Sequence, residues 1–292
     1  MIERRLSAIG VTIAMAAAVM ASGSVAAEPA LWTVSGGGST VYLFGSVHML
    51  PEGGFAIEGP LAEALEDAEK VCLEIDLGAV DELEMQRLTL ARVIDPQGRD
   101  LFTLLGPDAD KAKAAAAAAG LPLEPLAQFE PWFAGMMLSL LALQQHGFDV
   151  ENGVERIVDA SARAAGKQMC GFETADEQLA LFDEMPAGQQ REFLLQSIEE
   201  AGEVEADTRR LLRSWREGNE GAMAELFNED FAGYPELVDR LVYDRNARWT
   251  GQIAELLDGP DDVLVVVGAG HLVGERGVPA LLEKRGFKVG RN

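Results

Sequence analysis

The amino-acid sequence predicts an α/β fold with a mainly parallel central sheet, helices on its faces, and a helical insertion that forms a lid. Short runs of aliphatic and β-branched residues alternate with helix-length segments, which is the pattern of parallel strands joined by helices. The chain has 292 residues, of which 48% are hydrophobic and 25% charged, so it can bury a sizeable core. We expect one domain over residues 28–292.

Four segments have the composition of strands, at 41–44, 71–75, 168–172 and 263–267. The first stops at Gly45, and the last is a continuous aliphatic run, which is typical of a strand buried on both faces. Helical patterns lead into the second, third and fourth strands at 61–70, 153–167 and 234–257.

The rest of the chain is almost wholly helical in pattern, in two layers at about 96–145 and 185–232. Within them we expect helices at 107–119, 131–145 and 186–216. Aromatic and methionine side chains such as Trp132 and Met136 recur at helical spacing, which favours core packing over a cofactor site. We expect both layers to pack over one side of the sheet.

The N-terminus has the pattern of a secretory signal peptide at residues 1–27. Arg4 and Arg5 precede an uncharged apolar run at 6–20, and small residues at 25–27 suit cleavage after Ala27. An uncleaved membrane anchor is the alternative, but the run is short for a spanning helix. We therefore expect an exported protein, periplasmic or secreted, with no stable membrane insertion after cleavage.

Charge and cysteine content narrow the functional classes. Asp and Glu number 48 against 24 Lys and Arg, and the formal charge of −24 argues against nucleic-acid binding. Cys72 and Cys170 are the two cysteines. They could pair in an oxidising compartment or remain two buried thiols, because sequence alone gives no distance between them.

Two of the three histidines share one local pattern. Gly45-Ser-Val-His48 follows the first predicted strand, and Gly268-Ala-Gly-His271 follows the last. A glycine at a strand end lets the backbone turn sharply and approach a ligand, and the histidine then lies at the carboxyl edge of the sheet, where open α/β sheets place their sites. The third, His146, precedes Gly147 and fits a helix end.

A few polar residues near the same edge could complete a site. Glu74 ends an otherwise apolar strand, where a carboxylate costs several kcal/mol unless it meets a cation or a metal. Glu173 makes the same argument more weakly, and Arg245 and Asn246 lie late in the helix before the last strand, where an ordinary surface pair is the alternative.

Two histidines and a glutamate from different strand ends match the ligands of a catalytic divalent site. His48, Glu74 and His271 could bind zinc, manganese or cobalt, with iron as a further choice, and leave positions open for water. The metal would lower the pKa of that water and supply a nucleophile. Motifs of serine hydrolases, zincins and nucleotide enzymes do not appear.

The arrangement resembles the TraB/GumN family, which includes the bacterial YbaP-type proteins and is similar to the animal Tiki metalloproteases. The segments that carry the resemblance are 43–51, 71–76, 153–156, 166–174 with Gln178, 245–246, and 267–272 with Gly274. The resemblance implies that His48, Glu74 and His271 are active-site or metal residues, with Glu173, Arg245 and Asn246 as supporting members of the pocket. It also implies a fold like that of erythromycin esterases and a haem-binding lipoprotein.

These observations lead to a ranked set of functions. The first is an exported metal-dependent hydrolase, a peptidase, in which a metal-activated water attacks a carbonyl of a peptide or small-molecule substrate and Arg245 or Asn246 stabilises the oxyanion. A metal-free variant keeps Glu74 as general base with His48. The second is a non-catalytic envelope protein that binds haem, a metal or a peptide, and the third is an interaction protein with an idle motif. The oligomeric state is left open.

Overall fold

The computed structural model describes residues 28–76, 78–79, 81–231 and 233–292. The predicted signal peptide at 1–27 lies outside the described residues. Among the residues that are described, no helix is long and apolar enough to cross a bilayer.

A six-stranded sheet forms the centre of the molecule, in the order β6-β4-β7-β2-β1-β8. The strands are β1 (Leu31–Ser35), β2 (Val41–Ser46), β4 (Lys70–Ile75), β6 (Gln168–Glu173), β7 (Val263–Gly268) and β8 (Lys288–Arg291). The four neighbours from β6 to β2 are parallel, and β1 runs antiparallel to both β2 and β8. This confirms the mainly parallel sheet, with an edge of two strands that the sequence did not predict.

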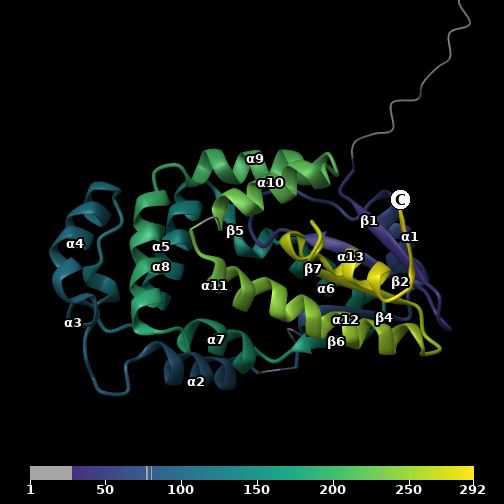
Figure 1. Ribbon diagram of the computed structural model, residues 1–292, viewed down its shortest axis with the longest axis horizontal. Helices are drawn as coiled ribbons and strands as arrows, with labels where there is room; N and C mark the ends of the chain where they lie inside the picture. Colours follow the sequence, from purple (N-terminus) through teal and green to yellow (C-terminus); the bar gives the residue numbers. More distant parts are fainter. Residues whose placement is uncertain (1–27, 77, 80, 232) are drawn as a thin grey trace, which may run out of the picture.

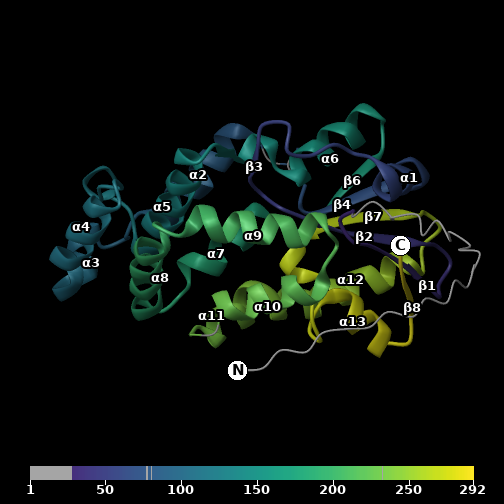
Figure 2. The same cartoon turned by 90° about the horizontal axis from the view of Figure 1, so that it is seen from above.

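Helices cover both faces of the sheet, as Figure 2 shows. Helices α1 (Gly59–Asp67) and α6 (Val154–Ala164) pack on one face, and α12 (Asp244–Leu257) and α13 (Val278–Lys284) on the other. Side chains of β7 divide between them: Leu264 and Val266 join the first cluster, while Val263, Val265 and Val267 join the second. Every residue of this run is buried, which explains its unbroken aliphatic character.

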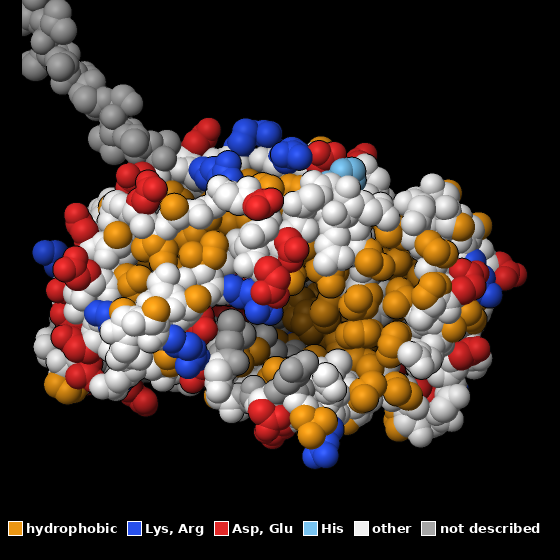
Figure 3. Space-filling view, turned by 180° about the vertical axis from the view of Figure 1, so that it is seen from behind, with side chains coloured by type: hydrophobic (Ala, Val, Ile, Leu, Met, Phe, Trp, Pro, Cys, Tyr) orange, Lys and Arg blue, Asp and Glu red, His pale blue; other side chains and the backbone are white. Residues whose placement is uncertain are grey.

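The remaining helices form an end of the fold and a layer beside the sheet (Figure 1). They are α2 (Glu82–Val93), α3 (Leu101–Leu105), α4 (Ala109–Ala118), α5 (Pro131–Gln145), α7 (Ala175–Asp183), α8 (Ala187–Glu200), α9 (Val204–Arg216), α10 (Glu220–Asp230) and α11 (Pro235–Val238). A two-stranded ribbon pairs β3 (Leu50–Pro51) with β5 (Phe148–Asp149). On the rear face, hydrophobic side chains gather around a hollow and over the helical end (Figure 3).

The helical layers differ from the sequence prediction in two ways. Helices α3, α4, α5 and α8 pack on one another around a hydrophobic cluster of their own, while α9 and α10, together with Leu140 and Leu143 of α5, contribute to the cluster on the sheet. The segment 186–216 is also two helices, because Gly202 lies in the turn between α8 and α9. Outside these layers, the segment 234–257, which was predicted to be helical throughout, is interrupted by a π-helical turn at Asp239–Tyr243.

The two Gly-x-x-His motifs lie side by side at the carboxyl edge. Gly45 pairs with Val267 and Ser46 with Gly268 in the β2–β7 ladder. A Cβ atom on Gly45 would lie 3.0 Å from the Cα of Ala269, so the close approach of the two strand ends requires glycine there. The Nε1 group of Trp215 donates to the carbonyl of Gly45 at 2.8 Å and holds α9 against the same edge.

A disulfide links Cys72 on β4 to Cys170 on β6. The two residues are direct partners in the parallel ladder, with 4.5 Å between their Cα atoms. Of the two alternatives that the sequence left open, the structure has the pair. The bond ties together the two strands that end at Glu74–Ile75 and Glu173.

Removal of this bond by Cys72→Ala/Cys170→Ala is expected to lower the free energy of unfolding by about 2–4 kcal/mol, because the bond constrains a long loop of the unfolded chain. Urea unfolding with and without dithiothreitol measures the effect. The reductant should destabilise the parent protein and leave the double mutant unchanged. An equal response of both proteins to the reductant would contradict the disulfide.

Candidate active site

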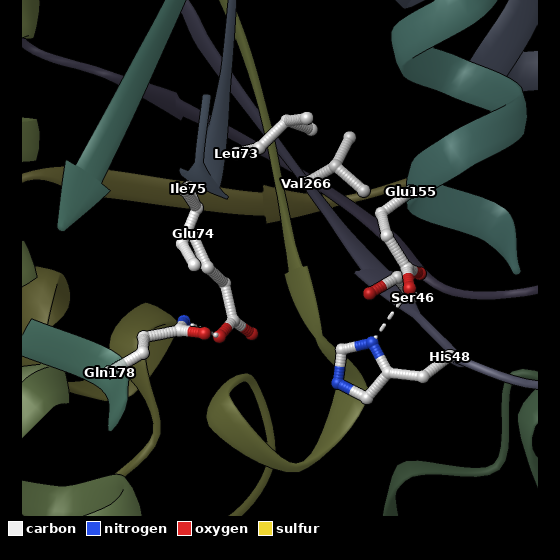
Figure 4. Close-up of a pocket in the computed structure, with 8 residues that line it drawn as sticks. All are labelled: Ser46, His48, Leu73, Glu74, Ile75, Glu155, Gln178 and Val266. Carbon is white, nitrogen blue, oxygen red and sulfur yellow. Dashed lines mark hydrogen bonds and ion pairs between the residues drawn. The ribbon is translucent and has the colours of Figure 1, made fainter. Parts of the chain in front are cut away.

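A pocket of about 140 Å³ opens at the carboxyl edge of the sheet (Figure 4). Its lining comes from β2, β4 and β7 and from helices α6 and α7: Ser46, His48, Leu73, Glu74, Ile75, Glu155, Gln178 and Val266. The pocket therefore lies at the carboxyl edge of the sheet, where the strands end and the two Gly-x-x-His motifs lie side by side.

Glu74 is the carboxylate at the centre of the site, with a side chain that is 15% exposed. Its Oε1 accepts from the backbone N–H of Gly268 at 2.8 Å, and its Oε2 accepts from Gln178 at 3.0 Å and from Arg245 at 2.5 Å. Burial alone would raise the pKa of Glu74, but the cationic groups around the carboxylate and the N–H of Gly268 lower it to about 2. Glu74 is therefore ionised at neutral pH.

Arg245 supplies the cation that the sequence required for Glu74. Its Nε and Nη2 atoms bind the carboxylate of Glu173 at 2.8–3.1 Å, and its Nη1 donates to the carbonyl of Leu241 at 2.9 Å. Leu241 belongs to the π-helical turn that precedes α12, and such turns are frequent at functional sites. Burial opposes the charge, but the two carboxylates raise the pKa of the guanidinium.

His271 lies in the 3₁₀ turn Ala269–His271 that follows β7 and is 6% exposed. Its Nδ1 lies 2.6 Å from Oδ1 of Asn246, whose Nδ2 donates to the carbonyl of Arg276 at 2.9 Å. Because that contact fixes the amide, Nδ1 of His271 carries the proton and Nε2 keeps its lone pair. Burial lowers the pKa of His271 to about 4, so the ring is neutral.

The lone pair of His271 faces two groups. Nη1 of Arg245 lies 3.2 Å from Nε2 and donates to it, while Oε1 of Glu74 lies 3.8 Å away. The indole of Trp249 packs against both the imidazole and the guanidinium, at 4.5 Å in each case. This indole excludes water from one side of the network.

His48 lies on the opposite wall of the pocket, as Figure 4 shows. Its side chain is 63% exposed, and it contributes to the wall of the pocket. Nδ1 forms an ion pair with Oε1 of Glu155 on α6, at 2.8 Å. Desolvation opposes a charge on the ring, but the hydrogen bond and the charge of Glu155 outweigh it and raise the pKa of His48 to about 9.

Gly268 marks the point where the three predicted ligands converge. A Cβ atom at this residue would lie 3.2 Å from Oε1 of Glu74, 3.4 Å from Cδ2 of His271 and 3.7 Å from Nε2 of His48. Only glycine leaves this space open. Gly268 of the second motif therefore makes room for the Glu74 carboxylate, just as Gly45 of the first motif makes room for the neighbouring strand end.

The donor set has the chemistry of a divalent site, but its spacing is wider than a metal requires. Two imidazoles and a carboxylate suit manganese, cobalt or zinc, and both histidines have Nδ1 bound to an oxygen, as metal-ligating histidines do. In the described part of the chain, however, no three His, Cys, Asp or Glu side chains lie close enough together to hold an ion. The guanidinium of Arg245 lies at the lone pair that a metal would need on His271.

The structure brings five of the six predicted residues into one buried network: Glu74, Glu173, Arg245, Asn246 and His271. His48 faces Glu74, one member of this network, across the pocket. Glu155 was missed, although it lies in a segment that carried the resemblance. One local signal was Gly153, where a Cβ atom would lie 2.5 Å from the carbonyl of His48, so that the start of α6 packs directly against the motif.

A model of the TraB/PrgY/gumN family matches residues 30–291, almost the whole described chain. The chain belongs to the TraB/PrgY/gumN family. This confirms the resemblance that the motifs predicted.

A curated relative is a "Metalloprotease TIKI homolog" from Amphimedon queenslandica, 44% identical over 57 residues. The match covers 19% of this chain and 11% of that protein, so the chain spans only a small part of its relative. No solved structure matches the chain, and the expected likeness to erythromycin esterases and the haem-binding lipoprotein stays a prediction.

The replacement Arg245→Met is expected to lower the free energy of unfolding by about 3–5 kcal/mol, because it leaves Glu74 and Glu173 as buried charges without their shared cation. Urea unfolding at neutral pH measures the loss. Arg248→Met is the matched control, since Arg248 pairs with Glu173 from a side chain that is 55% exposed. That control should cost less than about 1 kcal/mol. Equal losses in the two variants would contradict the central role of Arg245.

The replacement Glu155→Gln is expected to lower the pKa of His48 clearly from about 9, because the main anion that favours the charged ring is removed. Nitrogen-15 NMR of the imidazoles in the metal-free protein follows the titration, and the chain has only three histidines to assign. Glu151→Gln makes the same charge change one turn away and should leave the titration of His48 in place. An unchanged pKa in Glu155→Gln would show that another group holds the proton.

Proposed function

We propose that the chain is an exported, metal-dependent hydrolase of the peptidase type that works in the pocket beside Gly268. The observation that carries the proposal is the shared orientation of two imidazoles. Nδ1 of His48 is bound by Glu155 and Nδ1 of His271 by Asn246, so Nε2 of His48 is left for the pocket and Nε2 of His271 faces Arg245 and Glu74. The partial similarity to the Tiki homologue supports the same reaction class.

The proposed ligands are His48, Glu74 and His271, and manganese, cobalt or zinc suits them best, with iron as a further choice. What such a cation supplies, when these residues hold it, is a water of lowered pKa that can attack a carbonyl near neutral pH. His48 gives up the proton on its ring when it becomes a ligand, so binding is linked to proton release.

The chain's own groups do the remaining work. Asn246 keeps the proton of His271 on Nδ1, and Glu155 orients the ring of His48. Arg245 keeps Glu74 ionised and, once it leaves the lone pair of His271, presents Nη1 to the oxyanion of a substrate carbonyl. Glu173 retains the guanidinium through Nε during that movement.

One observation favours the metal-free variant as a second candidate. Nε2 of His271 already accepts a hydrogen bond from Arg245, and Glu74 already has a cationic partner. The charges of the site are therefore paired without a metal. In this variant Glu74 acts as the general base, and the protonated ring of His48 polarises the substrate carbonyl.

The disulfide supports the export part of the proposal. Bonds of this kind persist in oxidising compartments, such as the bacterial periplasm and the extracellular space, and are rare in the cytosol.

Metal content and hydrolysis test the proposal together. Mass spectrometry of the purified protein should find near-stoichiometric metal in the parent and in His146→Ala, and loss of that metal in His48→Ala/His271→Ala. Cleavage of an unfolded protein substrate by the metal-loaded chain should fall at least about 100-fold in Glu74→Gln.

The remaining outcomes separate the candidates. Manganese, cobalt, zinc and iron are each supplied in turn. Hydrolysis by a protein that binds none of them would leave the metal-free variant. Metal or haem bound without any hydrolysis would make the chain a binding protein. An equal metal content in all variants would show that the metal binds elsewhere.

A further inference from the structure

A second and larger cavity adjoins the candidate active site. Its volume is about 820 Å³, and His48 lies in its wall as well as in the wall of the smaller pocket. The cavity lies between His48 and helices α8, α9 and α10, which are neighbours in Figures 1 and 2. We call it the acidic groove. It is large enough for several residues of a peptide, whereas the pocket holds little more than the reacting group.

The charged side chains that line the acidic groove are almost all carboxylates. They are Glu199, Glu200, Glu203, Asp207 and Glu229, and each of these residues is exposed. The lining contains one arginine, Arg210, and it pairs with Glu229 at 2.9 Å. Among the described residues of the lining, the excess of negative charge is therefore concentrated on the end of α8 and the start of α9.

The titration of Tyr234 is consistent with a negative potential in the acidic groove. Tyr234 lines the groove beside these helices. Burial raises the pKa of its hydroxyl, and the charges of Glu192, Glu200 and Glu199 raise it further. The carboxylates of α8 therefore act on the interior of the groove as well as on the solvent around it.

The acidic groove also has an apolar floor. Leu143, Leu211 and Leu226 contribute to its wall, together with Val47 and Met49 next to His48. An occupant that matches the whole surface has cationic groups on an aliphatic scaffold. Lysine and arginine side chains on a peptide have that character, because each carries a charge at the end of an apolar stem.

We infer that the acidic groove selects peptide substrates rich in lysine and arginine and leads them to His48. The inference rests on the proposed function, since it names the substrate class of that hydrolase. The carboxylates of α8 and α9 hold the basic side chains, the leucines contact their stems, and the peptide backbone passes the opening to the pocket. Negative charge would also raise the rate of encounter with cationic peptides at low salt.

Three fluorescent peptides of equal length test this selectivity. They share one apolar sequence and carry lysine, glutamine or glutamate at the same positions. Fluorescence anisotropy with the metal-free full chain measures binding without turnover. Mass spectrometry with the manganese-loaded chain then measures kcat/KM for each peptide. The lysine peptide should bind tightest, and sodium chloride should weaken its binding by screening.

The groove variant is Glu199→Gln/Glu203→Gln/Asp207→Asn, which removes three negative charges without touching the pocket. It should weaken binding of the lysine peptide about tenfold, from three exposed charge contacts, and change binding of the glutamine peptide less than about twofold.

The matched control is Glu63→Gln/Glu255→Gln/Glu283→Gln. These three exposed residues lie on α1, α12 and α13, outside the groove lining, and their removal changes the net charge equally. The control should leave binding of the lysine peptide within about twofold of the parent, because distant charges are screened.

The outcomes separate this inference from the proposed function. Tight binding of the lysine peptide without cleavage of any peptide would support the groove and contradict the hydrolase. Cleavage of all three peptides at equal kcat/KM, or equal effects of the two triple variants, would overturn the groove and leave the hydrolase standing. Failure of every peptide to bind would also overturn the groove.

Discussion

The candidate site depends on one buried guanidinium. Arg245 is 6% exposed, and it meets two carboxylates, an imidazole nitrogen and a backbone carbonyl. A charge in such a place costs several kcal/mol unless it is fully paired, and the same holds for Glu74 and Glu173. The three groups are therefore stable only together, and they join α12 to the ends of β4 and β6. The disulfide joins the same two strands a few residues earlier, so both carboxylates are held in a fixed register.

This network makes the two motif histidines chemically different, although their local sequences are alike. His271 lies inside the network, where burial keeps it neutral with a lone pair on Nε2. His48 lies on the open side of the pocket, where Glu155 favours the protonated ring. Titratable pairs whose surroundings push their pKa values apart are typical of sites that need one donor and one acceptor of protons. The asymmetry arises from the partners of each ring.

The sequence predicted those parts of the fold and site that follow from local pattern. The run 263–267 could only be a strand buried on both faces, and a glycine directly after a strand placed His48 and His271 at one edge. Glu74 indicated a buried cationic partner, such as a basic side chain or a metal, because its carboxylate interrupts an apolar strand. Strands β1 and β8 were not predicted: both are short, and β8 is an edge strand that is mostly exposed.

Features that arise only from tertiary contact could not be predicted. Glu155 reaches His48 across 107 residues of sequence, and apart from Gly153 at the start of its helix nothing local distinguishes it from other helical glutamates. The disulfide required the register of β4 against β6, which neither cysteine determines alone. The helices α3, α4, α5 and α8 pack on one another because α5 is apolar on several sides: it offers α8 a face to pack on, while its Leu140 and Leu143 contact the cluster on the sheet.

The position of Glu173 shows how a cation could enter without dismantling the site. Arg245 binds Glu74 and His271 through its two terminal nitrogens, but Glu173 receives Nε as well as Nη2 and also pairs with Arg248. If Glu74 and His271 hold a divalent ion, the guanidinium of Arg245 still has its ion pair with Glu173 through Nε. Glu173 then keeps the arginine charge buried and paired in both arrangements. Glu173, which would contact no metal, is therefore the group that would allow Glu74 to exchange the guanidinium of Arg245 for a divalent ion.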